Sequence, residues 1–272
     1  PVKIGKATVP ESAICASNAD AIVVRGQDLC QDLIGQVNFA DYFYLLLTGR
    51  KPDAPASAVL NATLVAIAEH GLVPSVQAAR MTLAAAPDAL QGAVAAGILG
   101  CGSVILGASE TAGRLFDEID RAAPAHGGDL QAAARAVVGE WRARKQAVPG
   151  YGHPLHKERD PRVDALFAVS KKAGGGQRFV QIAEAVEAVL PEVIGKELKL
   201  NVSAAIPAVL LGVGFPLNAL KGVPMLARCA GLIAHMSEEL ETPIGFALSY
   251  QATRELRYTG TVPEGFVPDQ KL

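Results

Sequence analysis

Apolar residues recur every three or four positions along most of the chain, which is the spacing of the buried face of an amphipathic helix. A helix is expected to begin after Asn38, a favourable N-cap, and to continue through Leu47 to a stop at Gly49. Three further segments share this period, with apolar positions at Leu60, Leu64 and Ile67, at Leu130, Val137, Val138 and Trp141, and at Phe179, Ile182, Val186 and Val189. The pattern predicts an all-α chain of about a dozen helices.

The remaining segments predict a small amount of strand and several breaks. Two short β-rich runs, residues 2–9 and 21–25, predict a minor N-terminal β ribbon. The longest apolar stretch, residues 203–220, is interrupted by prolines and glycines, so it predicts a buried core helix rather than a membrane span. Segments rich in glycine or proline separate the helices at residues 122–128, 148–154 and 173–176.

Composition narrows the class of protein. Of the 272 residues, 50% are hydrophobic and 19% are charged, and 25 Lys+Arg against 27 Asp+Glu give a net charge of −2. These values exclude a disordered or collagen-like chain, and they argue against nucleic acid or a membrane surface as a partner. The surplus of apolar residues in a lightly charged chain predicts a buried subunit interface, and therefore a homodimer or higher homo-oligomer.

The cysteines and the first residues bear on the cellular compartment. Cys15, Cys30, Cys101 and Cys229 stand far apart without a CxxC pair, which predicts reduced thiols rather than a disulfide framework or a zinc site. Residues 1–12 lack the charged start and apolar core of a signal peptide. We therefore expect a cytoplasmic chain without a metal site.

The segment with the most chemical information is VPGYGHPLHKERDPR, residues 148–162. His153 follows Gly152 on an expected rigid, exposed turn, and Gly150 and Gly152 are expected to leave backbone N–H groups open to a ligand. Arg162 lies at a predicted helix start, where its planar guanidinium can bind a carboxylate. The residues alone leave two interpretations open, a ligand-binding turn or a turn histidine beside a structural ion pair.

PGYGH followed by DPR resembles the active-site turn of the citrate synthase superfamily. Other stretches agree with that family in order, and the AEHG loop with the helix after it is more similar to citryl-CoA lyases, including the C-terminal module of ATP-citrate lyase, than to citrate synthases. These stretches are RGQDLCQDLIGQVNFADYFYLLLTGRKP at residues 25–52, AEHG at 68–71, LNVSAAIPAVL at 200–210 and LARCAGLIAH at 226–235.

The resemblance implies a citrate synthase-like, all-α fold with two helical domains. A large domain is expected from residues 1–106 and 204–272, and a small domain from residues 107–203 is expected to act as a lid. The active site is then expected in the cleft, where closure of the small domain excludes water and protects an enolate.

The resemblance also implies roles for individual residues. His153 matches the turn histidine that moves a proton at the substrate's carbonyl or hydroxyl oxygen. Arg162 and Arg228 match arginines that bind the carboxylates of the substrate, and His70 matches the histidine that contacts the oxaloacetate portion. Physical chemistry adds that Arg228, in an apolar stretch, must meet some anion, either a structural carboxylate or a substrate. The alternative role of His70 is that of a capping histidine at the end of a helix.

A coenzyme A thioester is the implied substrate, without a permanently bound cofactor. The backbone of three residues matches the strip that holds the CoA adenine, and a lysine beyond it can reach a CoA phosphate. These CoA-binding positions are Val148, Gly150, Gly152 and Lys157. Arg254 and Arg257 fall near the position where the family's last arginine enters from a partner subunit, but the register there assigns neither to the site.

Two positions depart from the citrate synthase pattern. Ile105 stands where synthases have the histidine that hydrogen-bonds the thioester enolate; the lyase branch also replaces this histidine, so Ile105 favours a lyase. Ser203 occupies the position of the aspartate that removes or returns the α-proton of acetyl-CoA, and a serine hydroxyl is a poor base unless another base activates it. His126 also precedes two glycines, as the synthase histidine does, but it is not matched to that histidine and is expected to be a loop residue.

Several other polar residues have no predicted role in the site. Glu238, Glu239 and Glu241 are most simply a solvated helix face, and no partner is predicted for His156 or His235.

The leading hypothesis is an enzyme that cleaves or forms a carbon–carbon bond in a polycarboxylate acyl-CoA. Its reaction would convert citryl-CoA to acetyl-CoA and oxaloacetate, or act on a related substrate, with His153 and Ser203 as the catalytic pair. The alternatives are a citrate synthase-type acyltransferase, a non-catalytic protein that binds acyl-CoA or carboxylates, and an interaction subunit that needs neither ligand.

Overall fold

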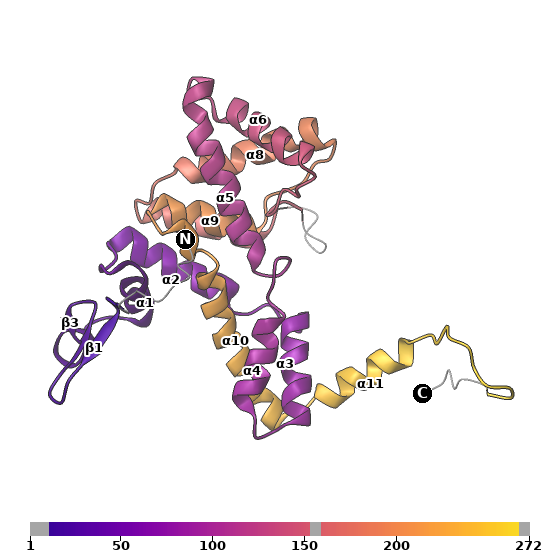
Figure 1. Cartoon of the computed structure of the whole chain (residues 1–272). Coiled ribbons are helices and arrows are strands. Elements are labelled where there is room, and N and C mark those ends of the chain that lie inside the picture. The colour runs from indigo at the N-terminus through magenta and orange to yellow at the C-terminus, as the bar shows by residue number, and fades with distance from the viewer. Residues whose placement is uncertain (1–10, 153–158, 267–272) are drawn as a thin grey trace, which may run out of the picture.

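The computed structural model describes residues 11–152 and 159–266, and most of the chain within these ranges is helical (Figure 1). This confirms the predicted all-α class with a minor N-terminal ribbon. The helices are α1 (Phe39–Thr48), α2 (Ala54–Ala68), α3 (Pro74–Ala85), α4 (Leu90–Leu99), α5 (Gly107–Ala122), α6 (Leu130–Ala143), α7 (Pro161–Lys172), α8 (Arg178–Ile194), α9 (Val202–Gly212), α10 (Gly222–Glu241) and α11 (Gly245–Glu255), with short helical turns at Leu29–Leu33, Ala123–His126 and Leu217–Ala219.

The N-terminal ribbon is a three-stranded antiparallel sheet of β1 (Cys15–Ser17), β2 (Ile22–Val24) and β3 (Gln27–Asp28). The predicted run at residues 21–25 is confirmed as β2, whereas residues 2–9 lie outside the described residues. The sequence did not predict β1 and β3, because strands of three and two residues are too short to show an alternating pattern.

Side-chain caps set several helix boundaries where the sequence placed them. Asn38 accepts a hydrogen bond from the N–H of Asp41 at 2.9 Å, and α1 ends at Gly49 with φ +75°. The side chain of Asp129 caps α6, and that of Asp160 caps α7. These caps satisfy backbone N–H groups that have no partner within the first helical turn.

Three apolar clusters hold the described helices together. The largest joins α1 and α2 to α5–α9 and the start of α10. A second lies between α3, α4 and α10, and a third joins the sheet to α1. Figure 1 shows α5, α6, α8 and α9 as one lobe and α3, α4 and the end of α10 as another, with α11 extending away from the body. The predicted domain boundaries remain a prediction. Helix α9, which starts near the predicted boundary, contacts α2 of the large domain as well as α5 and α8 of the small domain.

The long apolar stretch contains the buried core helix α9, which begins at Val202 and ends at Gly212. Most of its side chains are fully buried. Across residues 11–152 and 159–266, no helix has both the length and the apolar character needed to cross a membrane.

A buried ion pair fixes α3 against α10. Arg80 Nε donates to Glu239 Oε2 at 2.6 Å, and both side chains are almost completely buried. Glu239 also accepts from the N–H groups of Ile244 and Gly245, which start α11. The expectation of a solvated face is therefore wrong for Glu239. Its pKa lies below the ordinary value, because burial raises it less than the hydrogen bonds from Arg80 and the two N–H groups lower it.

Candidate active site

A cavity of about 180 Å³ opens where α2, α7, α9 and α10 meet the segment before α5. The segments that form it are far apart in the chain, and the large apolar cluster brings them together. Its polar lining comes from His70, Ser109, Arg162, Asn201, Ser203 and Arg228. The structure thus places four of the sequence-predicted site residues around one space.

Arg228 is the most deeply buried charged residue among those that line the cavity. The residue is only 3% exposed, and its Nη2 donates to the carbonyl oxygen of Ile67 at a long 3.4 Å. The Nε and Nη1 atoms are buried without a hydrogen-bond partner among the described residues. A buried guanidinium is costly unless an anion meets it. That Arg228 meets an anion stays a prediction, and within the described residues no carboxylate forms an ion pair with it.

Arg162 already has a carboxylate partner. Its Nε and Nη2 atoms donate to the two carboxylate oxygens of Asp160, at 3.0 and 2.8 Å. Asp160 is 1% exposed and also accepts from the N–H of Val202, so it joins the start of α7 to the start of α9. Burial raises the pKa of Asp160, but the hydrogen bonds from Arg162 and the backbone outweigh it and hold the pKa below its ordinary value. This pair holds the Arg162 side chain at the cavity wall.

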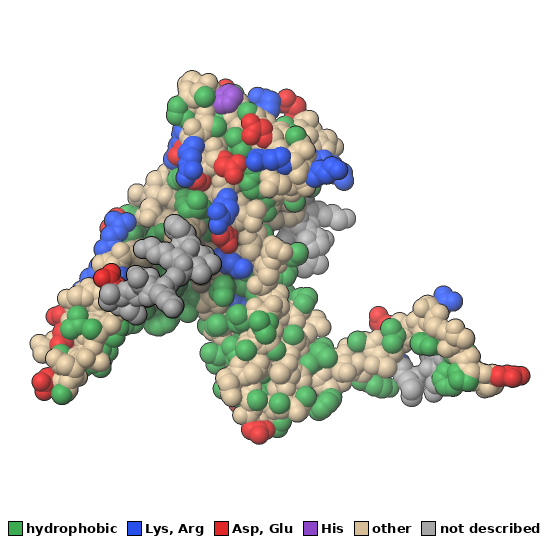
Figure 2. All heavy atoms as spheres, in the orientation of Figure 1, with side chains coloured by type: hydrophobic (Ala, Val, Ile, Leu, Met, Phe, Trp, Pro, Cys, Tyr) green, Lys and Arg blue, Asp and Glu red, His purple; other side chains and the backbone are tan. Residues whose placement is uncertain are grey.

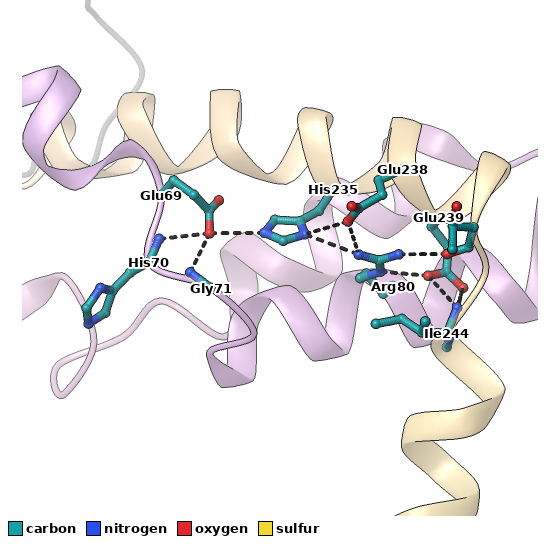
Figure 3. Close-up of polar contacts among 10 residues, drawn as sticks. Glu69, His70, Gly71, Arg80, His235, Glu238, Glu239 and Ile244 are labelled. Carbon is teal, nitrogen blue, oxygen red and sulfur yellow. Dashed lines mark hydrogen bonds and ion pairs between the residues drawn. The ribbon is translucent and has the colours of Figure 1, made fainter. Parts of the chain in front are cut away.

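His70 is exposed and lies directly after α2, in the loop that leads to α3. Its imidazole lines the cavity. The preceding Glu69 folds its carboxylate over the loop and accepts from the N–H groups of His70 and Gly71, at 2.8 and 2.5 Å. Figure 3 shows the His70 ring turned away from this carboxylate.

Ser203 lies in the first turn of α9, which Asn201 caps. The Asn201 Oδ1 accepts from the Ser203 N–H at 2.9 Å, and its Nδ2 donates to the Gly152 carbonyl at 2.6 Å. Sequence reasoning missed Asn201, although its position before an apolar helix is an N-cap signal. Among the described residues, no carboxylate takes the place of the missing aspartate in the cavity lining.

The glycine turn before His153 packs on the start of α9. Gly152 N–H donates to the Lys199 carbonyl at 2.7 Å, so the expectation that it stays open to a ligand is wrong. Gly150 has φ +89°, and a Cβ there would meet the Cβ of Ala204 at 2.5 Å, so only glycine fits. His153 and Lys157 lie outside the described residues.

Two further predicted positions are placed in or beside the site. Ile105 lines the cavity, so an apolar side chain occupies the place of the synthase histidine in the sequence comparison. Val148 is half-buried against the main apolar cluster, next to the glycine turn. His126 ends an exposed helical turn away from the cavity lining. In the part of the chain that the structure describes, no three His, Cys, Asp or Glu side chains are grouped to hold a metal ion.

Sequence comparison defines the class of protein. The family described as "Citrate synthase, C-terminal domain" matches residues 7–244, so the chain belongs to the citrate synthase family. The citrate synthase of Synechocystis sp. is 29% identical over 211 residues, covering 75% of this chain and 50% of that protein. The citrate synthase of Haloferax volcanii is 26% identical over 237 residues, covering 85% and 58%. The chain therefore spans about half the length of these relatives.

Solved structures show which proteins the chain resembles in its fold. The citryl-CoA lyase of Hydrogenobacter thermophilus superposes with a TM-score of 0.81 at 31% identity, covering 96% of this chain and 98% of that one. The ATP citrate lyase of Methanothrix soehngenii, solved with citrate and coenzyme A, gives 0.76 at 22% identity, covering 98% and 44%, which shows the shared fold. In structure, the chain is thus similar to a citryl-CoA lyase over 96% of its length, whereas the two curated relatives named above are synthases.

Proposed function

We propose that this protein breaks or forms a carbon–carbon bond in a polycarboxylate acyl-CoA, with citryl-CoA cleavage to acetyl-CoA and oxaloacetate as the leading reaction. One observation carries the proposal: the guanidinium of Arg228, which forms no ion pair within the described residues, lines the same cavity as His70, Arg162 and Ser203. The likeness to a citryl-CoA lyase over nearly the full length of both chains supports the lyase direction.

The cavity residues suit the carboxylate end of such a substrate. Arg228 has two buried donors without a partner among the described residues, so a carboxylate there gains charge-assisted hydrogen bonds without displacing any of those residues. Arg162 is held by Asp160 and presents its remaining edge to the same space. His70 also lines this cavity and contributes an imidazole to the proposed site. Together they bind the two carboxylates and the hydroxyl-bearing carbon.

In the cleavage direction, His153 takes the proton of the tertiary hydroxyl. The resulting oxygen forms a carbonyl, the carbon–carbon bond breaks, and its electron pair becomes the enolate of acetyl-CoA. A proton delivered to that enolate carbon completes acetyl-CoA, and oxaloacetate retains the new carbonyl. Ser203 stands where the family's aspartate would return this proton, so its hydroxyl, or a water that it holds, carries the step. The CoA adenine lies along the backbone of Val148, Gly150 and Gly152, with Lys157 on a CoA phosphate.

The experiment is an incubation of purified protein with citryl-CoA and, separately, with acetyl-CoA plus oxaloacetate, followed by mass spectrometry. Turnover of citryl-CoA supports the lyase, and citrate formed from the second mixture supports the synthase direction. Ser203→Asp tests the proton step: if the lyase lacks only its base, cleavage should rise by about 10²-fold. Ser203→Asn is the matched control, because asparagine has nearly the same shape as aspartate without its charge.

A non-catalytic acyl-CoA or carboxylate-binding protein is the second candidate. Ser203 and Ile105 together favour it, because the cavity keeps the arginines while two positions of the family's chemistry have changed. Calorimetric binding of oxaloacetate without turnover in either mixture, and little loss of affinity in His153→Ala, would select this candidate.

We also propose that the active unit is a homodimer or higher homo-oligomer. Over the lobe of α3, α4 and α10, Figure 2 shows hydrophobic side chains with almost no charged ones. The α11 arm packs mainly on α3 and exposes Phe246, Tyr250, Leu256 and Tyr258. Large apolar areas of this kind mark protein interfaces. A second copy of the chain fits both surfaces, and residues 107–203 then close over the cavity as a lid.

A further inference from the structure

A row of polar contacts leads from the start of α11 to the loop of His70 (Figure 3). At its loop end, His235 Nε2 lies 3.0 Å from Glu69 Oε1, the oxygen that also accepts from the N–H groups of His70 and Gly71. The proposed chemistry uses neither His235 nor Glu69. Their contact therefore needs a separate explanation.

Glu69 closes the turn that carries His70. The carboxylate follows the last residue of α2 and bonds to the next two backbone N–H groups, which fixes the direction in which the His70 side chain leaves the loop. Burial raises the pKa of Glu69, but the hydrogen bonds from His235, Gly71 and His70 hold it below the ordinary value. The carboxylate is thus ionised at neutral pH and is a strong acceptor.

His235 ties this turn to the helix that carries Arg228. It lies seven residues after Arg228 on α10, about two helical turns along the same face. Behind the ring, Nδ1 is 3.4 Å from Arg80 Nη1 and 3.9 Å from Glu238 Oε2. Arg80 is itself fixed by the buried pair with Glu239 described above. The ring therefore has a rigid support on the side opposite Glu69.

Successive turns of α10 contact successive residues at the end of α2. Arg228 donates to the carbonyl of Ile67, and His235 contacts Glu69. Between them, a Cβ at Gly231 would overlap the carbonyl oxygen of Ala68, so glycine permits the close approach. The contacts follow the order of both segments and set the register of the His70 loop along α10.

We propose that His235 and Glu69 are positioning residues that hold His70 at a fixed place relative to Arg228, and thereby shape the site for a dicarboxylate. The inference rests on the proposed function of the cavity for the ligand, but the contacts that hold the loop are present in the protein alone. His235 acts through Glu69 and the loop backbone, and touches neither substrate nor reacting atoms.

The first test measures the loop without any ligand. Amide hydrogen exchange, followed by mass spectrometry of the peptide with His70 and Gly71, should become about tenfold faster in His235→Leu, because Glu69 loses its anchor. Glu69→Ala should have the same effect, and His235→Gln, which retains a donor, should restore much of the protection. The matched control is His126→Leu, an exposed histidine far along the chain. Unchanged exchange in His235→Leu would overturn the proposal.

The second test is a double-mutant cycle with oxaloacetate as the probe, measured by titration calorimetry. His235→Leu and His70→Ala should each weaken binding by about tenfold, and the double variant should bind no more weakly than His70→Ala. Additive losses would overturn the proposal, because they would show that His235 acts independently of His70. If the wild type does not bind oxaloacetate or citrate, the proposed function of the cavity is wrong, and the exchange result alone decides on the positioning.

Discussion

Two parts of the molecule differ in the side chains that they expose to solvent. Among the described residues, every exposed large hydrophobic side chain lies in residues 14–104 or 233–266, and none lies between Ile105 and Leu232. The middle part instead carries ion pairs between its helices; examples are Arg135–Glu192, Arg178–Asp120 and Arg144–Glu118. Figure 2 shows the same contrast between a charged upper lobe and an apolar lower one.

This contrast indicates which part of the chain has a surface suited to a protein partner. A soluble monomer rarely exposes a large contiguous apolar area, because each fully buried Leu, Ile or Phe is worth about 1.5–3 kcal/mol. The middle part buries its apolar side chains within the chain. The flanking parts bury some of theirs and expose others, such as Leu99 and Phe246, and the proposed second copy of the chain would cover these.

The largest effect is expected from a charge placed on the apolar lobe. Leu99 is 86% exposed at the end of α4, and Ile233 is exposed on α10. If these side chains lie in a subunit interface, Leu99→Asp or Ile233→Asp buries an unpaired carboxylate and should separate the subunits. Light scattering should then change from about twice the chain mass of 28.2 kDa to a single mass. Ala188→Asp, at an exposed position on α8, is the matched control and should leave the mass unchanged. A wild type that scatters as one chain would contradict the comparison.

The sequence alone predicted the helical part of the fold well and the polar contacts poorly. The caps at Asn38 and Asp129 and the long periodic helices follow from local rules, so they could be placed without the structure. The buried role of Glu239 could not, because a helix-face pattern does not show that Arg80, far away in the chain, will meet it.

For the candidate site, the sequence likewise predicted some residues well and missed the polar contacts that depend on packing. Motif resemblance selected His70, Arg162, Ser203 and Arg228, and the structure places all four around one cavity. The contact of His235 with Glu69 was missed. It depends on how α10 packs against the end of α2, which spacing along the chain does not encode.

The two arginines of the cavity should respond differently, because Arg162 is paired with Asp160 whereas Arg228 forms no ion pair among the described residues. Arg228→Leu should weaken oxaloacetate binding by about 2–3 kcal/mol, because it removes buried donors that only a ligand satisfies. The free energy of unfolding should hardly change, since no carboxylate in the described part of the chain loses a partner. Arg162→Leu should weaken binding too, and it should also destabilise the fold by about 3 kcal/mol, because buried Asp160 loses its cation.

Calorimetry and urea unfolding of both variants check this difference. Arg178→Leu, on the exposed surface of the middle part, is the control for removal of an arginine and should change neither quantity much. If Arg228→Leu destabilised the protein as strongly as Arg162→Leu, Arg228 would be a structural residue rather than a binding residue.

A smaller effect is expected from acid, and each part of the molecule has a buried carboxylate whose pKa is lowered. The pKa values of Asp160 in the middle part and Glu239 in the flanking part both lie below the ordinary values near 4. Each ionised carboxylate therefore contributes stability above about pH 4, and this stability is lost as the pH falls through the lowered pKa. Asp160→Asn and Glu239→Gln should each cost about 2 kcal/mol at pH 7, and less as the pH drops.

Urea unfolding at several pH values between 7 and about 3 measures this trend. The gap between wild type and each variant should narrow towards low pH, and a constant gap would show that the lost stability comes from shape rather than charge. Gln131→Asn, at an exposed position on α6, is a control for an amide change without a buried ion pair.

The smallest effect should come from the ion pairs that cover the middle part. Arg135 and Glu192 link α6 to α8 at 2.9 Å, but their side chains are 46% and 61% exposed. Water screens such a pair, so the coupling free energy in a double-mutant cycle of Arg135→Ala and Glu192→Ala should stay below about 0.5–1 kcal/mol. It should disappear in 1 M salt, where the screening length is about 3 Å. A coupling well above this range would mean that the ion pairs hold the middle part together. The expected small value assigns its stability to the buried side chains beneath, and leaves the charges to keep that surface free of partners.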